Sequence, residues 1–142
     1  MSEIKTNKLT GTSTAGSILV TGEGNSTTTN LQQGLAKSWG SIDQDSTDHP
    51  IYDSFNLAST SDQGTGYTIC SYSNAMNNAN YSITVAGQTQ DEAGAHAGVY
   101  GKSTTVASQT SAAGSFSLDN RSNSGGQKDL KYCAYAIHGD LA

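Results

Sequence analysis

Charge, proline and long apolar runs are all scarce in this chain of 142 residues. It has one proline and 13% charged residues, with 7 Lys and Arg against 12 Asp and Glu for a formal net charge of −5. No apolar run approaches the roughly 20 residues that cross a bilayer, so membrane insertion is not expected. Seven scattered basic residues cannot form the positive stripe that binds phosphates, so nucleic acid is not an expected partner.

Cysteine is almost absent as well. Cys70 and Cys133 are far apart and have no second Cys or His at ligand spacing, so the sequence predicts neither a metal site nor a cofactor. The first residues lack the apolar core of a signal peptide, and synthesis in a cytoplasm is therefore expected. In that reducing compartment we expect two free, buried thiols, with a disulfide left as a geometric alternative.

The residues that are plentiful are small and polar: Ser, Thr, Asn, Gln and Gly make up 71 of the 142 positions. Aromatic residues nevertheless recur along the chain, which is unlike a disordered tail. Helical periodicity is nearly absent, whereas apolar and polar residues alternate as in half-buried strands. The alternating segments are Ser54–Leu57, Tyr81–Val85, Ser115–Leu118 and Cys133–Ile137.

Turn-forming clusters such as Asp62–Gly66 separate these segments, and no segment is long enough for a crossover helix. The sequence therefore predicts an all-β fold, an antiparallel β-sandwich of about seven strands over residues 34–142.

Residues 1–33 differ from the rest and are predicted to be an N-terminal arm. Strand candidates are Ile4–Thr10 and Ser17–Thr21, and Leu31–Lys37 is a candidate helical turn. Such a segment is either a flexible tail or an arm that becomes ordered on another subunit. We take the second reading, with five apolar residues as the attachment surface: Ile4, Leu9, Ile18, Leu19 and Val20.

The apolar content is low for a free-standing core. Inward strand positions are often Ala, Ser, Gly or Thr, which bury little apolar area. Association of copies around a symmetry axis would supply the missing burial, so a homo-oligomer is expected.

The sequence contains no clear catalytic motif. The acidic loop Asp43–Asp48 lacks the Gly and Glu of a calcium loop and is interpreted as a solvated loop, with a weak cation site as the alternative. Asp91, Glu92 and His96 form a second polar group, and His96 is expected near Tyr100 on one strand face. We interpret Asp91, His96 and Tyr100 as candidate surface-ligand contacts. No nucleophile elbow accompanies them, and no spacing selects a pair of carboxylates, so an enzyme is not expected.

Aromatic residues offer another kind of site. Trp39 and the seven Tyr could build a sugar-stacking surface, since an aromatic ring beside Asn or Asp donors and acceptors suits a carbohydrate. Most of these rings are expected in the core or in interfaces instead.

Five segments together resemble a domain that recurs in tail-fibre and other structural proteins of tailed phages, especially marine ones. They are Gly34–Trp39, Asp53–Ser59, Asp62–Thr68, Ala75–Tyr81 and Ala134–Asp140. The opening Ser2–Leu9 is also similar to the openings of such proteins. After Trp39 that family usually continues Val-Asn-Phe, where this chain has Gly40-Ser41-Ile42.

The resemblance implies a virion β-domain without a catalytic motif, trimeric and exposed outside the particle. The corresponding expectation is a small homotrimeric tail-fibre or appendage protein, which binds other virion proteins through its arm and a host-surface glycan or protein through its β-domain. A capsid decoration or head-fibre protein is the first alternative, and a glycan-acting enzyme is the second.

Overall fold

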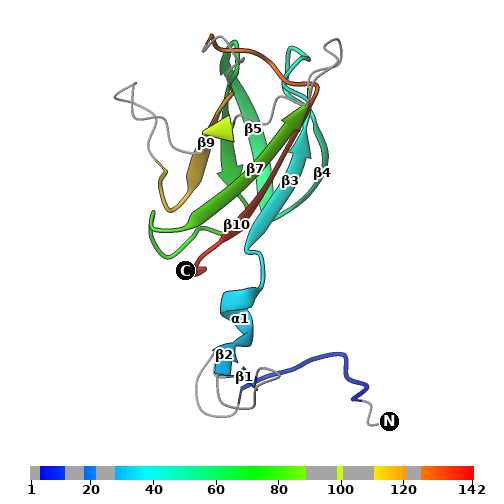
Figure 1. The fold of residues 1–142 in the computed structure, drawn as a ribbon, viewed down its shortest axis with the longest axis vertical. Coiled ribbons are helices and arrows are strands. Elements are labelled where there is room, and N and C mark those ends of the chain that lie inside the picture. Colours follow the sequence, from blue (N-terminus) through cyan, green and yellow to red (C-terminus); the bar gives the residue numbers. More distant parts are fainter. Residues whose placement is uncertain (1–3, 12–17, 22–27, 89–98, 101–110, 121–125) are drawn as a thin grey trace. The chain divides into compact units, whose positions relative to one another are not determined.

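The computed structural model describes residues 4–11, 18–21, 28–88, 99–100, 111–120 and 126–142 (Figure 1). The chain separates into two compact units, Met1–Leu35 and Ala36–Ala142, a boundary two residues beyond the predicted one. Among the described residues, no helix is long and apolar enough to span a membrane.

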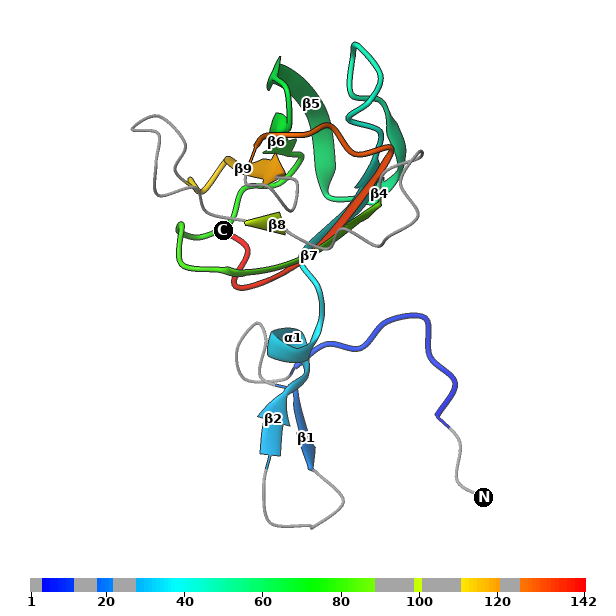
Figure 2. The ribbon, with the colours of Figure 1, turned by 45° about the horizontal axis from the view of Figure 1, so that its top comes forward.

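The second unit is built from two four-stranded antiparallel sheets, which confirms the predicted all-β, sandwich-like fold. One sheet has the strand order β4-β3-β10-β7, and the other has the order β5-β6-β9-β8. Figure 2 shows the strands of the two sheets facing each other. The strands of the first sheet are β3 (Ser38–Ile42), β4 (Ile51–Phe55), β7 (Ser82–Gln88) and β10 (Tyr132–His138). Those of the second are β5 (Leu57–Gly64), β6 (Tyr67–Tyr72), β8 (Val99–Tyr100) and β9 (Ser115–Asn120).

The predicted alternation places the core on β10. Cys133, Tyr135 and Ile137 are buried, and Ile83 and Val85 of the neighbouring β7 pack against them. Because β10 lies between β3 and β7, it is a central strand of its sheet, and its inward side chains face the opposite sheet. The core therefore forms between strands that are distant in sequence.

Aromatic rings join the two sheets. The rings of Phe116 on β9 and Tyr135 on β10 lie edge to face with centroids 4.6 Å apart, and Tyr72 stacks on Phe116 at 5.4 Å. A Cβ at Gly40 would come within 2.8 Å of the Tyr135 ring, so this position of β3 has to be small. The same ring is hydrogen-bonded through its hydroxyl to Ser38 at 3.3 Å.

One strand prediction is wrong in a way that changes the surface. Phe55 and Leu57 were expected on one face of a single strand, but Asn56 lies between β4 and β5 with φ of 57°. Its side chain donates to the carbonyls of Lys37 and Asn74 at 3.0 Å, and its Oδ1 accepts the N–H of Asn74 at 2.7 Å. The chain passes from one sheet to the other at this corner, so Leu57 is buried while Phe55 is exposed.

The first unit is a short hairpin, β1 (Leu19–Thr21) with β2 (Thr28–Asn30), followed by α1 (Leu31–Gly34). Asn30 caps α1, because its Oδ1 accepts the N–H of Gln32 at 2.8 Å. The expected strand over Ile4–Thr10 is absent from the described residues, and the expected turn over Leu31–Lys37 is shorter. The second strand candidate begins at Leu19 rather than Ser17, because Ile18 precedes the ladder.

Candidate binding surface

The residues predicted to contact a surface ligand are not brought together by the described structure. Asp91 and His96 lie outside the described residues. Tyr100 is in β8, where its backbone pairs with Asp119 of β9. These three residues therefore stay a prediction, and the surface that can be described lies elsewhere.

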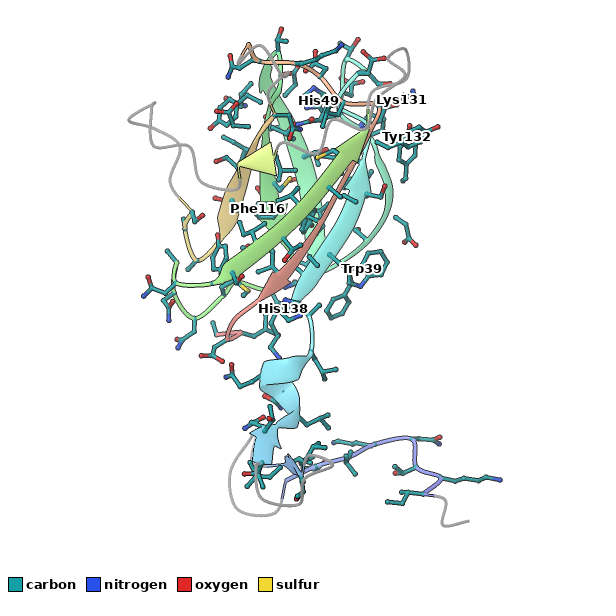
Figure 3. All side chains as sticks on the ribbon, viewed as in Figure 1. Trp39, His49, Phe116, Lys131, Tyr132 and His138 are labelled. Carbon is teal, nitrogen blue, oxygen red and sulfur yellow. The ribbon has the colours of Figure 1, made fainter. Side chains whose placement is uncertain are left out.

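An aromatic face lies on the outer side of the sheet β4-β3-β10-β7. It consists of four rings, each 40–51% exposed: Trp39, Tyr52, Phe55 and Tyr132. Figure 3 shows Trp39 and Tyr132 projecting away from the sandwich, whereas Phe116 lies between its sheets. The sequence predicts most of the aromatic residues in the core or in interfaces, and Tyr72 and Tyr135 do lie in the core, whereas these four rings are exposed.

Strand register explains how these rings share one face. Trp39 pairs directly with Phe55 on β4 and with Ala136 on β10, and paired residues of antiparallel strands point to the same side. Tyr132 is four residues before Ala136, about 13 Å along the strand. The ladder slips between Ser41 and Ile42, and Tyr52 is the extra residue on β4. The bulge turns Tyr52 outward beside Tyr132, with ring centroids 5.8 Å apart.

Small residues separate the rings. Ser41 pairs with Asp53 and with Ala134, and Ala134 pairs with Ala86, so a low row of side chains crosses the sheet between the two aromatic pairs. Asp53 is the only acidic residue on these four strands, and they carry no Lys or Arg. These four strands therefore present exposed rings and a single carboxylate on their outer side.

A buried carboxylate anchors one end of this face. Asp43 Oδ2 accepts hydrogen bonds from Tyr52 at 2.8 Å, Ser46 at 3.0 Å and Lys131 at 2.5 Å. Burial acts to raise the pKa of Asp43, but the bonds from Lys131, Tyr52 and Ser46 outweigh it and hold the pKa at about 2. The bond to Asp43 in turn raises the pKa of the Tyr52 hydroxyl. The Tyr52 ring is thus fixed through its hydroxyl and by packing beside Tyr132, and about half of its surface remains exposed.

A second polar cluster combines an exposed acid, Asp62, with a buried imidazole and a buried hydroxyl. His49 Nε2 lies 3.5 Å from Asp62 Oδ1, and His49 Nδ1 is 2.8 Å from Thr68 Oγ1. The order of acid, imidazole and hydroxyl resembles a catalytic triad. Thr68 is fully buried, however, and its Oγ1 also accepts a hydrogen bond from Gln44 Nε2 at 2.7 Å. Gln44 Oε1 accepts a further bond from the Asn120 amide. The Thr68 hydroxyl is enclosed, and the cluster joins the loop residues Gln44 and His49 to the sheet β5-β6-β9-β8.

The two thiols are free and buried, as predicted. Burial raises the pKa of Cys70 well above its usual range and that of Cys133 to about 11, against the small opposing effect of Asn120 Nδ2, 3.5 Å from the Cys133 sulfur. The raised pKa values disfavour the thiolate form, which is the nucleophilic form of cysteine, near neutral pH.

The acidic loop shows no metal-binding arrangement. Asp43 is directed to Lys131 and Tyr52, and the described residues contain no group of three or more His, Cys, Asp or Glu that could hold a metal ion.

The arm exposes its apolar residues. Ile4, Leu9, Leu19 and Val20 are all exposed, Ile4 by 87%, and Ile18 is half-buried with its carbonyl accepting the N–H of Leu31 at 2.8 Å. Between β2 and α1 lies an open, mainly apolar pocket of about 270 Å³. Val20, Leu31 and Leu35 are among its lining residues. No described residue of Met1–Leu35 is buried.

Comparisons with known proteins add no support to the resemblance to phage proteins. No protein-family model matches the chain, and no match was found among curated proteins or solved structures.

Proposed function

We propose that this chain is a non-enzymatic structural protein of a phage virion, a small homotrimeric tail-fibre or appendage protein. Its N-terminal arm attaches it to other virion proteins, and its β-sandwich is displayed outside the particle for adsorption to the host surface. The proposal joins the resemblance to tail-fibre proteins with the division of the chain into two unlike units.

The observation that carries the proposal is the contrast in burial between the units. The sandwich encloses a core that includes Phe116, Leu118 and Ile137, whereas the arm has no buried residue in its described part. A hairpin of two three-residue strands and a helix of four residues are too short to be stable alone. Such an arm becomes stable when its apolar residues are covered by another chain, as an attachment segment requires.

Non-enzymatic function is supported by the polar groups of the sandwich. The one chain of acid, imidazole and hydroxyl found among the described residues ends at the enclosed Thr68. The aromatic face, by contrast, is open and suited to contact with a large partner.

The experiment is to add purified chain to particles from which it has been deleted. Full-length protein should be incorporated and restore adsorption, whereas residues 36–142 should fold but remain in solution. Imaging a labelled chain then locates it: label on the tail agrees with the proposal, and label over the head indicates a decoration or head-fibre protein. Incorporation of residues 36–142 at the full-length level would show that the arm is not the attachment segment.

A further inference from the structure

We propose that the aromatic face, Trp39, Tyr52, Phe55 and Tyr132, binds a neutral polysaccharide chain. This inference rests on the proposed adsorption function and names the chemical class of its ligand. It places the contact on the outer side of the sheet β4-β3-β10-β7 rather than at Asp91, His96 and Tyr100.

The shape of the face suits a chain of sugar rings. Two aromatic pairs, Trp39 with Phe55 and Tyr52 with Tyr132, stand about 13 Å apart along the strands. Between them lie Ser41 and Ala134, whose short side chains leave room for an extended ligand to lie flat. The apolar faces of pyranose rings pack on aromatic rings, and a platform of this kind holds several sugar units at once.

The charge of the face selects among ligands. Asp53 is the one acidic residue on the four strands, and at the Tyr52 end of the face Asp43 and Lys131 are paired with each other. Asp53 is exposed and accepts a hydrogen bond from the N–H of Ser54 through Oδ1 at 2.8 Å, which leaves its second oxygen as an acceptor. A carboxylate among aromatic rings, with no Lys or Arg on these strands, is complementary to sugar hydroxyl donors and repels anionic polymers. The net charge of −5 acts in the same direction.

The same charge argues against a second copy of the chain as the occupant. Asp53 lies between Tyr52 and Phe55 in the sequence and pairs with Ser41 in the middle of β3. A symmetric contact through this face would bury two or three copies of that carboxylate without a basic partner from these strands, which costs free energy. A hydrated carbohydrate leaves Asp53 hydrogen-bonded.

Part of the binding geometry is fixed before the ligand arrives. The hydroxyl of Tyr52 is held by Asp43, and Tyr132 packs at 5.8 Å from the Tyr52 ring. Rings that are already ordered lose little conformational entropy when a sugar packs on them.

Trp39 provides the readout, because it is the only tryptophan in the chain. Full-length protein is titrated with soluble neutral polysaccharides (dextran, galactomannan and hydroxyethyl cellulose) and with anionic dextran sulfate and alginate, and Trp39 emission is recorded. We expect a saturable shift with at least one neutral polymer and none with the anionic ones. Phe55→Ala and Tyr132→Ala retain the reporter and should each weaken binding about tenfold.

Leu141→Ala is the matched control, since Leu141 is an exposed apolar residue outside the four strands. It should bind like the parent chain, and thermal melts should show that all three variants are folded. The inference fails if no neutral polymer shifts the emission, or if the Phe55 and Tyr132 variants bind normally. It also fails if those variants lower the oligomer mass in the absence of polysaccharide, because the face would then join copies of the chain.

Adsorption of particles separates the two proposals. If deleting the chain abolishes adsorption while Phe55→Ala and Tyr132→Ala particles adsorb normally, the polysaccharide inference is wrong and the proposed function stands. If deleting the chain leaves adsorption unchanged, the proposed function is wrong whatever the fluorescence shows.

Discussion

At the scale of single residues, Asp43 connects the interior to the aromatic face. It is 2% exposed, and its carboxylate joins β4 through Tyr52 to the residue preceding β10 through Lys131. Its folded-state pKa of about 2 lies below the ordinary 3.8, so ionised Asp43 stabilises the fold above about pH 4. That contribution is lost as the pH falls from about 4 towards 2, where the group becomes protonated.

Replacing Asp43 with Asn should therefore destabilise the protein in a pH-dependent way. At pH 7 we expect a loss of about 1–3 kcal/mol in the free energy of unfolding, because Lys131 loses its charged partner. The difference from the parent chain should shrink as the pH is lowered towards 2. Urea unfolding at several pH values measures this, with the neighbouring exposed Asp45→Asn as control. A loss that is the same at every pH would contradict the assigned pKa.

Cys70 and Cys133 give a second prediction at this scale. Both thiols are buried and have raised pKa values, so iodoacetamide should label neither in the folded protein at pH 8 and both in urea. Mass spectrometry counts the added groups, and the same spectra without reductant should show two free thiols. Rapid labelling of the folded chain would show that the core opens near these residues.

At the scale of elements, the β5–β6 turn is fixed by contacts distant in sequence. Gly66 has φ of +72°, its N–H donates to Asp129 Oδ1 at 2.6 Å, and its carbonyl accepts the N–H of Asn120 at 2.7 Å. A Cβ here would meet the Asn120 carbonyl oxygen at 2.5 Å and the Lys128 nitrogen at 2.7 Å. Both are backbone atoms, so the clash cannot be relieved by moving a side chain.

Gly66→Ala should consequently cost more than about 2 kcal/mol of stability through positive φ and steric clash together. Gly114→Ala is the control, because its Cβ would meet nothing within 4 Å and its φ is not in the positive region. Thermal and urea unfolding of the two variants compare them. Equal stability would mean that the turn moves away from Asn120 at little cost.

Element prediction from the sequence succeeded where inward residues are apolar and failed where they are small. Cys133–Ile137 alternates as a half-buried strand and is one. On β3 the inward residues are Ser38, Gly40 and Ile42, while Trp39 points outward, because the Tyr135 ring from β10 fills the space over Gly40. The aromatic face was hidden for the same reason. The four rings share one face because of the strand register and the corner at Asn56. The alternation of apolar and polar residues within one segment does not predict either feature.

At the scale of the whole molecule, the apolar deficit noted in the sequence is unevenly distributed. The sandwich packs its own buried residues around Phe116 and Tyr135, whereas the first unit, Met1–Leu35, leaves Ile4, Leu9, Leu19 and Leu35 exposed and holds an open pocket that Leu35 helps to line. The sequence placed the need for association in the β-domain, whose inward strand positions are small; from the exposed apolar residues of Met1–Leu35 we propose instead that this first unit is the associating segment. The pocket and the exposed apolar side chains lie in the same short segment. The apolar side chains of one copy can therefore pack against this segment of another copy.

Association should accordingly depend on the arm. Full-length protein should scatter light as a multiple of 14.7 kDa, three for the proposed trimer, while residues 36–142 should be a monomer that unfolds cooperatively. Leu19→Asp with Leu35→Asp should give the monomer in the full chain without changing the melt of the sandwich, because both side chains are exposed and a buried charge would oppose assembly. Thr6→Asp is the control for added charge on an exposed residue outside the hairpin and α1. If residues 36–142 alone formed an oligomer, the surface that joins the copies would lie on the sandwich. The arm would then serve attachment only.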